Sequence, residues 1–505
     1  MKKYIFIATA FFAISSALLF SCSDDFTDTE PKYVINSETF FNAPEDYSKA
    51  LVGVYDMLQS TYLNVMAGEI ASDNTLAGGE SPTDVIGIQQ IDDMTQTPTN
   101  AQLSNIWQWM FAGVQRANYI LENENKIDFE GKNQIIGETR FLRAYFHFEL
   151  VKWFGPIPLS GDKRFAPGDE TTIPRAPVPD VYASIESDLL YAVDNLAPIA
   201  SQTGRATRGA ALALLGKAYL YQEKYSQAAS TFETLITAGN YHLITETDLT
   251  PAQIAAGISP YKSIFEMSGE NGKESVFEVQ YTDVEGAGFG CLQCSEGNVA
   301  VGFNGVRNYV GPDYTSGFSF NVPTQETYNT FEVGDSRLPV SLLDIATWSA
   351  ETGATFGKGN EDTGFFNQKY LPRIRSNQAQ GDLNLTNPNN YRAIRYADVL
   401  LMAAEANNKI GNDPRALEYL NKVRDRAFRD ENHRVTSVGA ALYDVILNER
   451  RVELVGEGMR FFDLVRTNKA AGTIDGFQFP KNNLFPVPLE EIQFSNGNWQ
   501  QNPGY

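Results

Sequence analysis

Hydrophobic residues recur at helical spacing over much of the chain. Between positions 43 and 59, the residues Ala50, Leu51, Val54 and Leu58 fall on one face of a helix, and a stripe of this kind predicts an amphipathic helix. The same periodicity predicts helices over 103–123, 132–154, 181–196, 208–239, 394–410, 414–428 and 440–456. Helices therefore occupy both ends of the chain, with a long interruption between them.

Two stretches lack this periodicity. Residues 68–100 are polar and include the pair Gly78-Gly79, and the segment is too long for an ordinary connection. Residues 241–390 are rich in Gly, Asn, Thr and aromatic residues, with short strand-like pieces such as 274–281. We predict a mainly α fold, in which a helical scaffold carries a large insertion of irregular loops and short strands.

Part of the helical pattern resembles a repeat. The segment 208–239 has small and aromatic residues at the offsets of the 34-residue tetratricopeptide pattern, in which a small residue lets two helices approach closely. These residues are Leu215, Gly216, Tyr219, Ala228 and Phe232. A weaker copy spans 400–427. Because the two copies are far apart in the sequence, we predict tetratricopeptide-type helix pairs distributed through the scaffold rather than an uninterrupted array of repeats.

The N-terminus resembles a bacterial lipoprotein signal peptide. Lys2 and Lys3 precede an apolar run over 4–20, and Cys22 follows a small residue, as in secretory signals. We expect residues 1–21 to be removed, Cys22 to be lipidated, and residues 22–36 to form a polar tether. The alternative is an ordinary signal peptide with a cysteine there by chance. No other stretch is long and apolar enough to span a bilayer, so one lipid anchor would hold the protein at a membrane.

Charge and cysteine content exclude several classes of protein. The 505 residues include 40 Lys and Arg against 62 Asp and Glu, a net charge of −22, which argues against nucleic acid as a partner because phosphate binding needs clustered cations. Cys291 and Cys294 form a C-x-x-C motif in a Gly-rich loop. With no second cysteine pair and no nearby histidine, we interpret them as a local disulfide, rather than a zinc or redox site. No metal or cofactor is expected.

Catalysis is not expected either. The chain has no G-x-S-x-G, H-E-x-x-H or Walker A motif. Glu449 and Glu453 share one helical face, as the two carboxylates of a glycoside hydrolase could. However, Arg450 and Arg451 lie between them, and a neighbouring cation lowers a carboxyl pKa, which is the wrong direction for a general acid. We interpret the charged pairs on these helices, including Arg140 and Arg143, as ion pairs of the scaffold.

Several blocks along the whole mature chain resemble the SusD/RagB lipoproteins. The N-terminal blocks are GETRFLRAYF (137–146), WFGPIPL (153–159) and RATRGAA (205–211). The C-terminal blocks are IRYADVLLM (394–402), ILNERRVEL (446–454), RFFDLVR (460–466) and FPVP (485–488). Their order along the chain, behind a lipoprotein signal, makes the resemblance specific.

The resemblance implies a SusD-like fold and a role as a non-catalytic glycan-binding protein. Members of the family deliver their ligand to a SusC-like TonB-dependent transporter at the cell-surface side of the outer membrane. The residues Ser23-Asp24-Asp25 after the cysteine resemble an export signal to that surface. A SusD-like helical region would occupy 37–240 and a RagB/SusD region 241–505, with the ligand-binding insertion at 241–390. Capture of peptides in place of glycans remains an alternative.

Aromatic residues of the insertion are the candidates for glycan binding, because sugar rings stack on aromatic faces. Tyr309, Tyr314 and Trp348 have Gly or polar neighbours and carry a polar atom, although packing inside the insertion is the alternative role for such residues. We add Arg307 as a donor to ligand hydroxyl groups. The chain has no aromatic residue between Tyr62 and Trp107, unlike starch-binding members of the family. In that early loop the polar residues Asp73, Asn74, Glu80 and Asp84 could accept hydrogen bonds from sugar hydroxyls instead.

Overall fold

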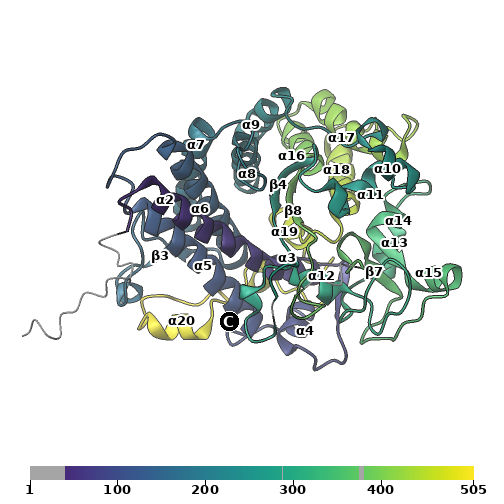
Figure 1. The fold of residues 1–505 in the computed structure, drawn as a ribbon, viewed down its shortest axis with the longest axis horizontal. Helices are drawn as coiled ribbons and strands as arrows, with labels where there is room; N and C mark the ends of the chain where they lie inside the picture. Colours follow the sequence, from purple (N-terminus) through teal and green to yellow (C-terminus); the bar gives the residue numbers. More distant parts are fainter. Residues whose placement is uncertain (1–39, 287, 375–379) are drawn as a thin grey trace, which may run out of the picture.

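A computed structural model of the protein describes residues 40–286, 288–374 and 380–505. The signal peptide, Cys22 and the tether predicted from the sequence lie outside the described residues. Within the described part the fold is mainly α-helical (Figure 1), which confirms the predicted fold class. No helix in this part is long and apolar enough to cross a membrane.

The scaffold is a row of helices in which each packs on the next. Contacts join α5 to α6, α6 to α7, α7 to α8 and α8 to α9, and α9 packs directly on α16, which contacts α17 and α18. α2 covers α5 and α6. The helices are α2 (Pro44–Asp56), α5 (Ala101–Leu121), α6 (Lys132–Phe154), α7 (Val178–Asn195), α8 (Arg208–Tyr221), α9 (Tyr225–Thr237), α16 (Tyr396–Lys409), α17 (Asp413–Phe428) and α18 (Gly439–Leu454).

The repeat-like segment 208–239 forms a pair of helices, α8 and α9, and the chain turns between them at Glu223, which has a positive φ of 58°. The two repeat-like segments are far apart in the sequence but adjacent in space, since α9 and α16 are neighbours. The close approach expected at Gly216 is present, because a side-chain carbon there would lie 2.4 Å from the Phe232 ring.

The insertion contains more short helices than its composition indicated. They are α10 (Pro251–Ala255), α11 (Pro260–Phe265), α12 (Val299–Asn304), α13 (Gln325–Asn329), α14 (Leu338–Ser341) and α15 (Ile345–Thr352). Outside the insertion lie η2 (Met57–Thr61), α3 (Tyr62–Ile70), α4 (Ile86–Asp92), α19 (Arg460–Arg466) and α20 (Leu489–Phe494). In Figure 1, α15 lies at the right-hand edge and α20 at the lower left.

The described residues form four pairs of short antiparallel strands, and the first and third of these pairs join distant parts of the chain. They are β1 (Thr75–Gly78) with β5 (Phe320–Pro323), β2 (Ile157–Pro158) with β3 (Arg175–Ala176), β4 (Ser275–Val279) with β8 (Tyr391–Arg395), and β6 (Leu342–Asp344) with β7 (Phe365–Asn367). The β1–β5 pair connects the early polar segment to the insertion. This pairing places residues near 80 beside residues near 319.

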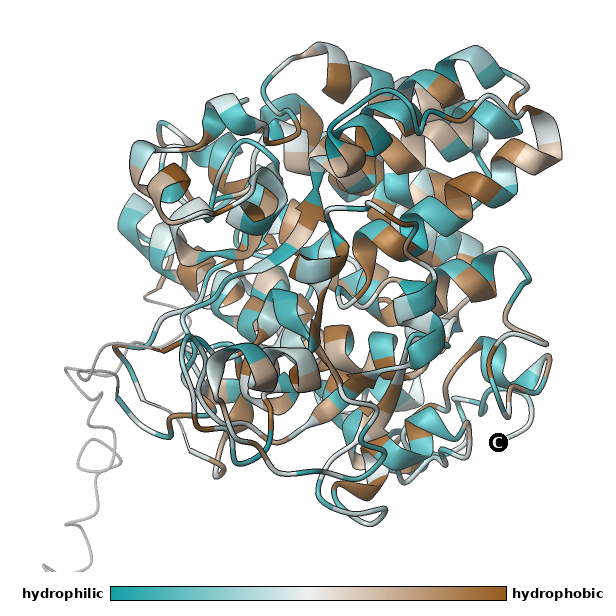
Figure 2. Cartoon of the chain, turned by 90° about the vertical axis from the view of Figure 1, so that its right-hand side faces the viewer, coloured by the Kyte–Doolittle hydropathy of each residue, from teal (hydrophilic) through white to brown (hydrophobic). Residues whose placement is uncertain are grey.

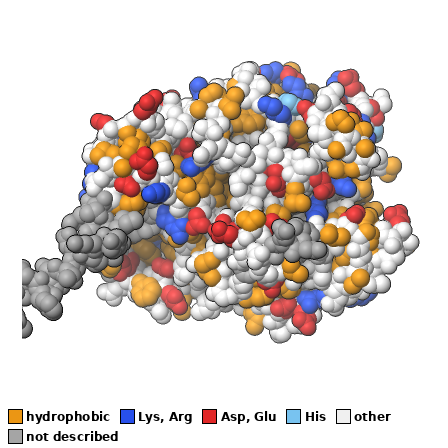
Figure 3. Space-filling view, viewed as in Figure 1, with side chains coloured by type: hydrophobic (Ala, Val, Ile, Leu, Met, Phe, Trp, Pro, Cys, Tyr) orange, Lys and Arg blue, Asp and Glu red, His pale blue; other side chains and the backbone are white. Residues whose placement is uncertain are grey.

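The hydrophobic core has one large part and smaller satellites. The large part is formed by the helical scaffold, and a separate cluster lies beneath α15, with Val306, Leu343, Ile345, Phe366 and Leu371 among its buried residues. Hydrophobic and hydrophilic residues alternate along the helices (Figure 2), as expected for helices that each bury one face. On the face in Figure 3, acidic and basic side chains are interspersed, with no large basic patch.

Candidate functional site

The structure brings the three predicted aromatic residues together at α15. This helix begins at Asp344, whose carboxylate accepts hydrogen bonds from the backbone N–H groups of Ala346 and Thr347 at 3.0 and 3.1 Å. A carboxylate at this position satisfies N–H groups that have no partner within the helix. The cap determines where the helix starts and therefore where Trp348, in its first turns, is presented.

Trp348 is held by the two tyrosines. Its indole Nε1 donates a hydrogen bond of 2.8 Å to Tyr309 Oη, and the Tyr309 hydroxyl donates to the Pro312 carbonyl at 2.7 Å. The Tyr314 ring lies between the other two rings, with its centroid 5.7 Å from Trp348 and 6.2 Å from Tyr309. Burial raises the pKa of Tyr314 above its ordinary value, so its hydroxyl stays neutral and accepts a hydrogen bond from Gln368 at 2.9 Å.

Exposure separates the roles of these three residues. Tyr309 and Tyr314 are only 5% and 7% exposed, whereas Trp348 is half-buried. The tyrosines therefore do not offer open ring faces to a ligand, which differs from the sequence expectation. They support Trp348, whose ring reaches the surface.

Arg307 lies next to this group. Residues 307–310 run beside the segment that follows α15, with hydrogen bonds between Val310 and Thr355 in both directions at 2.9 Å and from Gly357 N–H to the Arg307 carbonyl at 2.8 Å. The Arg307 guanidinium donates to the Phe318 carbonyl at 2.8 Å and to Ser319 Oγ at 3.2 Å. The backbone pairing and these two bonds fix the direction of the guanidinium group.

The early polar loop reaches Arg307 through two of its acidic residues. Glu80 Oε2 lies 3.6 Å from Arg307 Nη1, and Asp84 Oδ2 lies 3.9 Å from Nη2. Both distances are too long for hydrogen bonds. The Glu80 side chain can therefore turn toward a ligand at little cost, whereas Asp84 Oδ2 already accepts a hydrogen bond of 2.8 Å from Glu80 N–H. We call the surface formed by Trp348, Arg307, Glu80 and Asp84 the α15 surface.

The other two polar candidates of the early loop face the scaffold. The Asp73 carboxylate pairs with Arg460 at 2.7 Å and with Arg451 at 3.0 Å. Asn74 is fully buried, donates to Glu69 at 3.0 Å and accepts from Arg451 at 2.8 Å. Because their polar atoms are occupied by α3, α18 and α19 neighbours, the structure favours a scaffold role for both.

The charged helical pairs are buried in the scaffold, as the sequence indicated. Arg337 Nη1 contacts Glu449 at 2.7 Å and Glu453 at 2.9 Å, and Glu453 also pairs with Arg395 and Arg426. These guanidinium groups hold the pKa of Glu453 far below its ordinary value despite its burial. A carboxyl group that cannot be protonated and that no substrate can reach is unsuited to act as a general acid.

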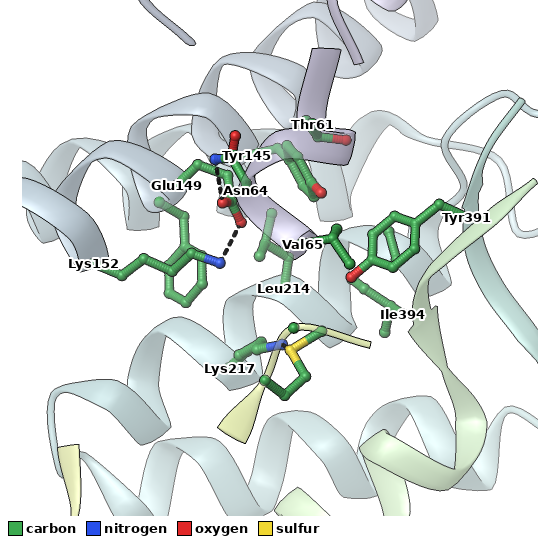
Figure 4. Close-up of a pocket in the computed structure, with 14 residues that line it drawn as sticks. Thr61, Asn64, Val65, Tyr145, Glu149, Lys152, Leu214, Lys217, Tyr391 and Ile394 are labelled. Atoms are coloured by element: carbon green, nitrogen blue, oxygen red, sulfur yellow. Dashed lines mark hydrogen bonds and ion pairs between the residues drawn. The ribbon is translucent and has the colours of Figure 1, made fainter. Parts of the chain in front are cut away.

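A second set of charged groups surrounds a small internal cavity (Figure 4). Lys152 pairs with Glu149 at 2.6 Å, Asn64 donates to Glu149 at 2.7 Å, and Lys217 lies on the opposite wall. The cavity holds about 20 Å³, which is enough for one water molecule and far too small for a sugar. Burial lowers the pKa of Lys152. This cavity belongs to the scaffold and is not a ligand site.

Cysteine and metal chemistry complete the description of the site. Cys291 and Cys294 are joined by a disulfide. Among the described residues no group of three or more His, Cys, Asp or Glu side chains is arranged to hold a metal ion. Phe289 is one of the aromatic residues of the insertion for which the sequence favoured core packing over ligand contact, but it is 62% exposed beside this disulfide.

Comparison with known proteins identifies the family. The model of the SusD family matches residues 344–505, and a model described as starch-binding associating with outer membrane matches residues 25–220. A solved laminarin binding SusD-like protein is 34% identical, with a TM-score of 0.80 over 92% of this chain and 100% of the other. The chain therefore belongs to the SusD family.

The similarity to two further relatives also extends over almost the whole chain. Surface glycan-binding protein A from Bacteroides fluxus is 26% identical, with a TM-score of 0.80, over 92% of this chain and 100% of the other. SusD-like protein P38 of Formosa agariphila is 27% identical over 94% of this chain and 95% of its own length. The similarity thus covers the scaffold and the insertion together.

Proposed function

We propose that this protein binds a glycan at the α15 surface without chemically changing it. The observation that carries the proposal is Trp348, whose ring is partly exposed and whose orientation is held by Tyr309 and Tyr314. A sugar ring presents an axial C–H face that packs on an indole, and a ring that is already fixed loses little entropy on binding. Arg307, Glu80 and Asp84 lie where they can bind the hydroxyl groups at the sugar edges.

Laminarin is the first ligand to test. The relative with 34% identity is named as a laminarin binding protein, and this identity extends over its whole chain. The early loop of the present protein supplies carboxylates in place of an aromatic ring, so its surface favours a ligand held by one stacked ring and several hydroxyl contacts. Peptide capture by the same surface is a distinct outcome of the test.

The proposed role is the capture of the glycan outside the cell for delivery to a SusC-like TonB-dependent transporter. The lipoprotein-like N-terminus with Cys22 supports attachment to the outer membrane, as does the description of the family model that matches residues 25–220. Cys22→Ser should release the protein from the membrane fraction of its host. Accessibility of the wild-type protein to protease on intact cells would test its surface exposure.

The binding test compares the removal of the aromatic ring at Trp348 with the removal of the ring at Phe494. Titration calorimetry with laminarin should show binding by the wild type and a loss of roughly 10-fold or more for Trp348→Ala, since the variant loses most of the apolar contact. Phe494→Ala is the matched control, because Phe494 is an exposed ring on α20, at the opposite side of the molecule from α15 in Figure 1. Failure of the wild type to bind any glycan, or competition by peptides alone, would refute the proposal.

A further inference from the structure

Phe289 is an aromatic ring that stays mostly exposed although one edge contacts Phe318. It is 62% exposed and stands between Gly288 and Gly290. A side-chain carbon placed on either glycine would meet no atom of the described residues within 4 Å, so the backbone on both sides projects into solvent. A ring in this position is open to solvent and is therefore available to stack on a sugar.

The loop that carries Phe289 is restrained at its base and near its tip. At its base, Thr282 N–H donates to the Glu296 carbonyl at 2.7 Å, and Gln59 donates to the Glu296 side chain at 2.7 Å. Near its tip, the disulfide between Cys291 and Cys294 restrains the backbone two residues after Phe289. The disulfide therefore restricts the positions that the ring can reach.

Ring contacts connect Phe289 to the α15 surface. The Phe289 ring packs edge-on against Phe318 with centroids 6.0 Å apart, and Phe318 continues to Phe303 at 5.7 Å. The carbonyl of Phe318 is the group that accepts the hydrogen bond from Arg307. Phe289 is therefore linked to Arg307 through Phe318, and Trp348 lies on α15, whose following segment pairs with residues 307–310.

We infer that Phe289 is a second stacking position for the same glycan, placed by the disulfide loop, and that it contacts only chains long enough to extend past Arg307 from Trp348. The inference rests on the proposed function, because it assigns a further contact to the same ligand. It predicts that the affinity depends on the length of the glycan, which a single stacking residue would not produce. A ligand that reaches both rings gains the second contact at a reduced entropic cost, since the first contact already holds the chain.

The test measures affinity against glycan length. With laminarin, Phe289→Ala should bind about 3-fold to 10-fold more weakly than the wild type, which corresponds to one partly exposed apolar contact. The loss should shrink for laminarihexaose and be smallest for laminaribiose. Phe289→Trp should retain the affinity, and Phe494→Ala is again the exposed-ring control.

A second variant tests the disulfide. Cys291→Ser with Cys294→Ser should reproduce the loss seen in Phe289→Ala, and combining all three substitutions should cause no further loss, because both changes remove one contact. Unchanged affinity in the double serine variant would overturn the role of the disulfide.

The remaining outcomes separate this inference from the proposed function. Laminarin binding that is lost in Trp348→Ala and unaltered in Phe289→Ala would overturn the inference and leave the proposed function in place. An equal loss for all glycan lengths, together with a lower melting temperature, would indicate a purely structural role and overturn it as well. Absence of binding by the wild type would overturn both.

Discussion

Glu453 lies at the centre of a buried cluster of arginines. Its carboxylate is fully buried and pairs with Arg337 at 2.9 Å, Arg395 at 2.8 Å and Arg426 at 2.6 Å. Taking a carboxylate out of water costs several kcal/mol, and only close partners of opposite charge offset this cost. The three arginines come from the insertion, β8 and α17, so the pairing holds these parts against α18.

We expect Glu453→Gln to lower the free energy of unfolding by about 3–5 kcal/mol, because it removes the carboxylate that three buried guanidinium groups share. Urea titration followed by circular dichroism measures the change. Asp444→Asn removes the exposed partner of Lys469 and should change stability by less than about 1 kcal/mol. Equal effects of the two substitutions would contradict the organising role of Glu453.

Asp92 gives a pH dependence of stability with a definite sign. Burial, opposed by a hydrogen bond from Ala77 N–H, raises the pKa of Asp92 from 3.8 to about 7. Between these values the folded protein keeps a proton that the unfolded chain has released. The contribution of Asp92 to stability is therefore present at low pH and is lost as the pH rises from 3.8 through 7.

Asp92→Asn should accordingly stabilise the protein at pH 8 by about 1–2 kcal/mol and have little effect at pH 4, because the amide carries no charge to desolvate. Melting temperatures of both proteins at the two pH values measure this. Asp93→Asn removes a charge from the exposed neighbouring residue, which makes only a minor contribution to the raised pKa of Asp92, and it should show a much smaller difference between the two pH values. A larger gain at pH 4 than at pH 8 would show that the sign is wrong.

The ligand residues show how much of the site a sequence can predict. Tyr309, Tyr314, Trp348 and Arg307 were selected from their neighbours and lie together in the structure. Composition could not distinguish the partly exposed Trp348 from the two tyrosines that support it, because all three are aromatic residues with a polar atom in a loop-rich segment. Asp73 and Asn74 have the same polar character as Glu80 and Asp84, and only the folded chain directs the first pair inward.

At the scale of elements, Gly216 determines how closely α8 and α9 approach. A methyl group at this position would lie 2.4–2.8 Å from atoms of the Phe232 ring, which is buried. We therefore expect Gly216→Ala to destabilise the protein by about 1–3 kcal/mol through overpacking, despite the higher helix propensity of alanine.

Gly53→Ala in α2 is the matched substitution. No atom of the described residues lies within 4 Å of the added carbon, so only helix propensity acts, and stability should rise by about 0.5–1 kcal/mol. Urea unfolding of both variants measures the contrast. A stabilising effect of Gly216→Ala would contradict the close packing of α8 on α9.

Long periodic helices were predictable, whereas short ones were not. The helices at 101–121 and 132–154 each carry a repeating apolar stripe, which reports a buried face without reference to the rest of the fold. Helices α10 to α15 have at most eight residues, too few for a period to be distinguished from chance. α15, the helix that presents Trp348, belongs to this group. Its start is determined by the cap at Asp344, which hydrophobic periodicity does not detect, so the position of the candidate site could not be predicted from the pattern.

At the scale of the whole molecule, the two halves of the scaffold are interlocked. The buried carboxylate of Glu69 accepts hydrogen bonds of 2.9 Å from the N–H groups of Gly456 and Gly458, and Lys217 pairs with Asp398 at 3.5 Å. β4 pairs with β8 across more than a hundred residues of insertion. The contacts of Glu69 and Lys217 cross the boundary at residue 240 that the sequence suggested, whereas both strands of the β4–β8 pair lie on its C-terminal side.

A fragment of residues 40–240 should therefore not fold independently. Separation would expose the face of α9 that packs on α16 and leave Glu69 and Lys217 without their partners, and buried charges without partners are strongly destabilising. Thermal scans followed by circular dichroism should show no cooperative transition for the fragment and a cooperative one for residues 40–505. A sharp transition in the fragment would show that the boundary separates two autonomous domains.

The sequence by itself determined the family, the helical character of the scaffold, the ion-pairing role of its charged blocks and the group of residues that contains the candidate site. These properties depend on residues close together in the sequence or on the order of residues along the chain, so they can be predicted without the tertiary structure. The tertiary structure alone decided that α9 meets α16, that Trp348 is partly exposed while Tyr309 and Tyr314 are buried, and that Asp73 and Asn74 face inward. Each of these depends on contacts between residues far apart in the chain. Chemically similar side chains have different roles at these positions because the fold gives them different neighbours.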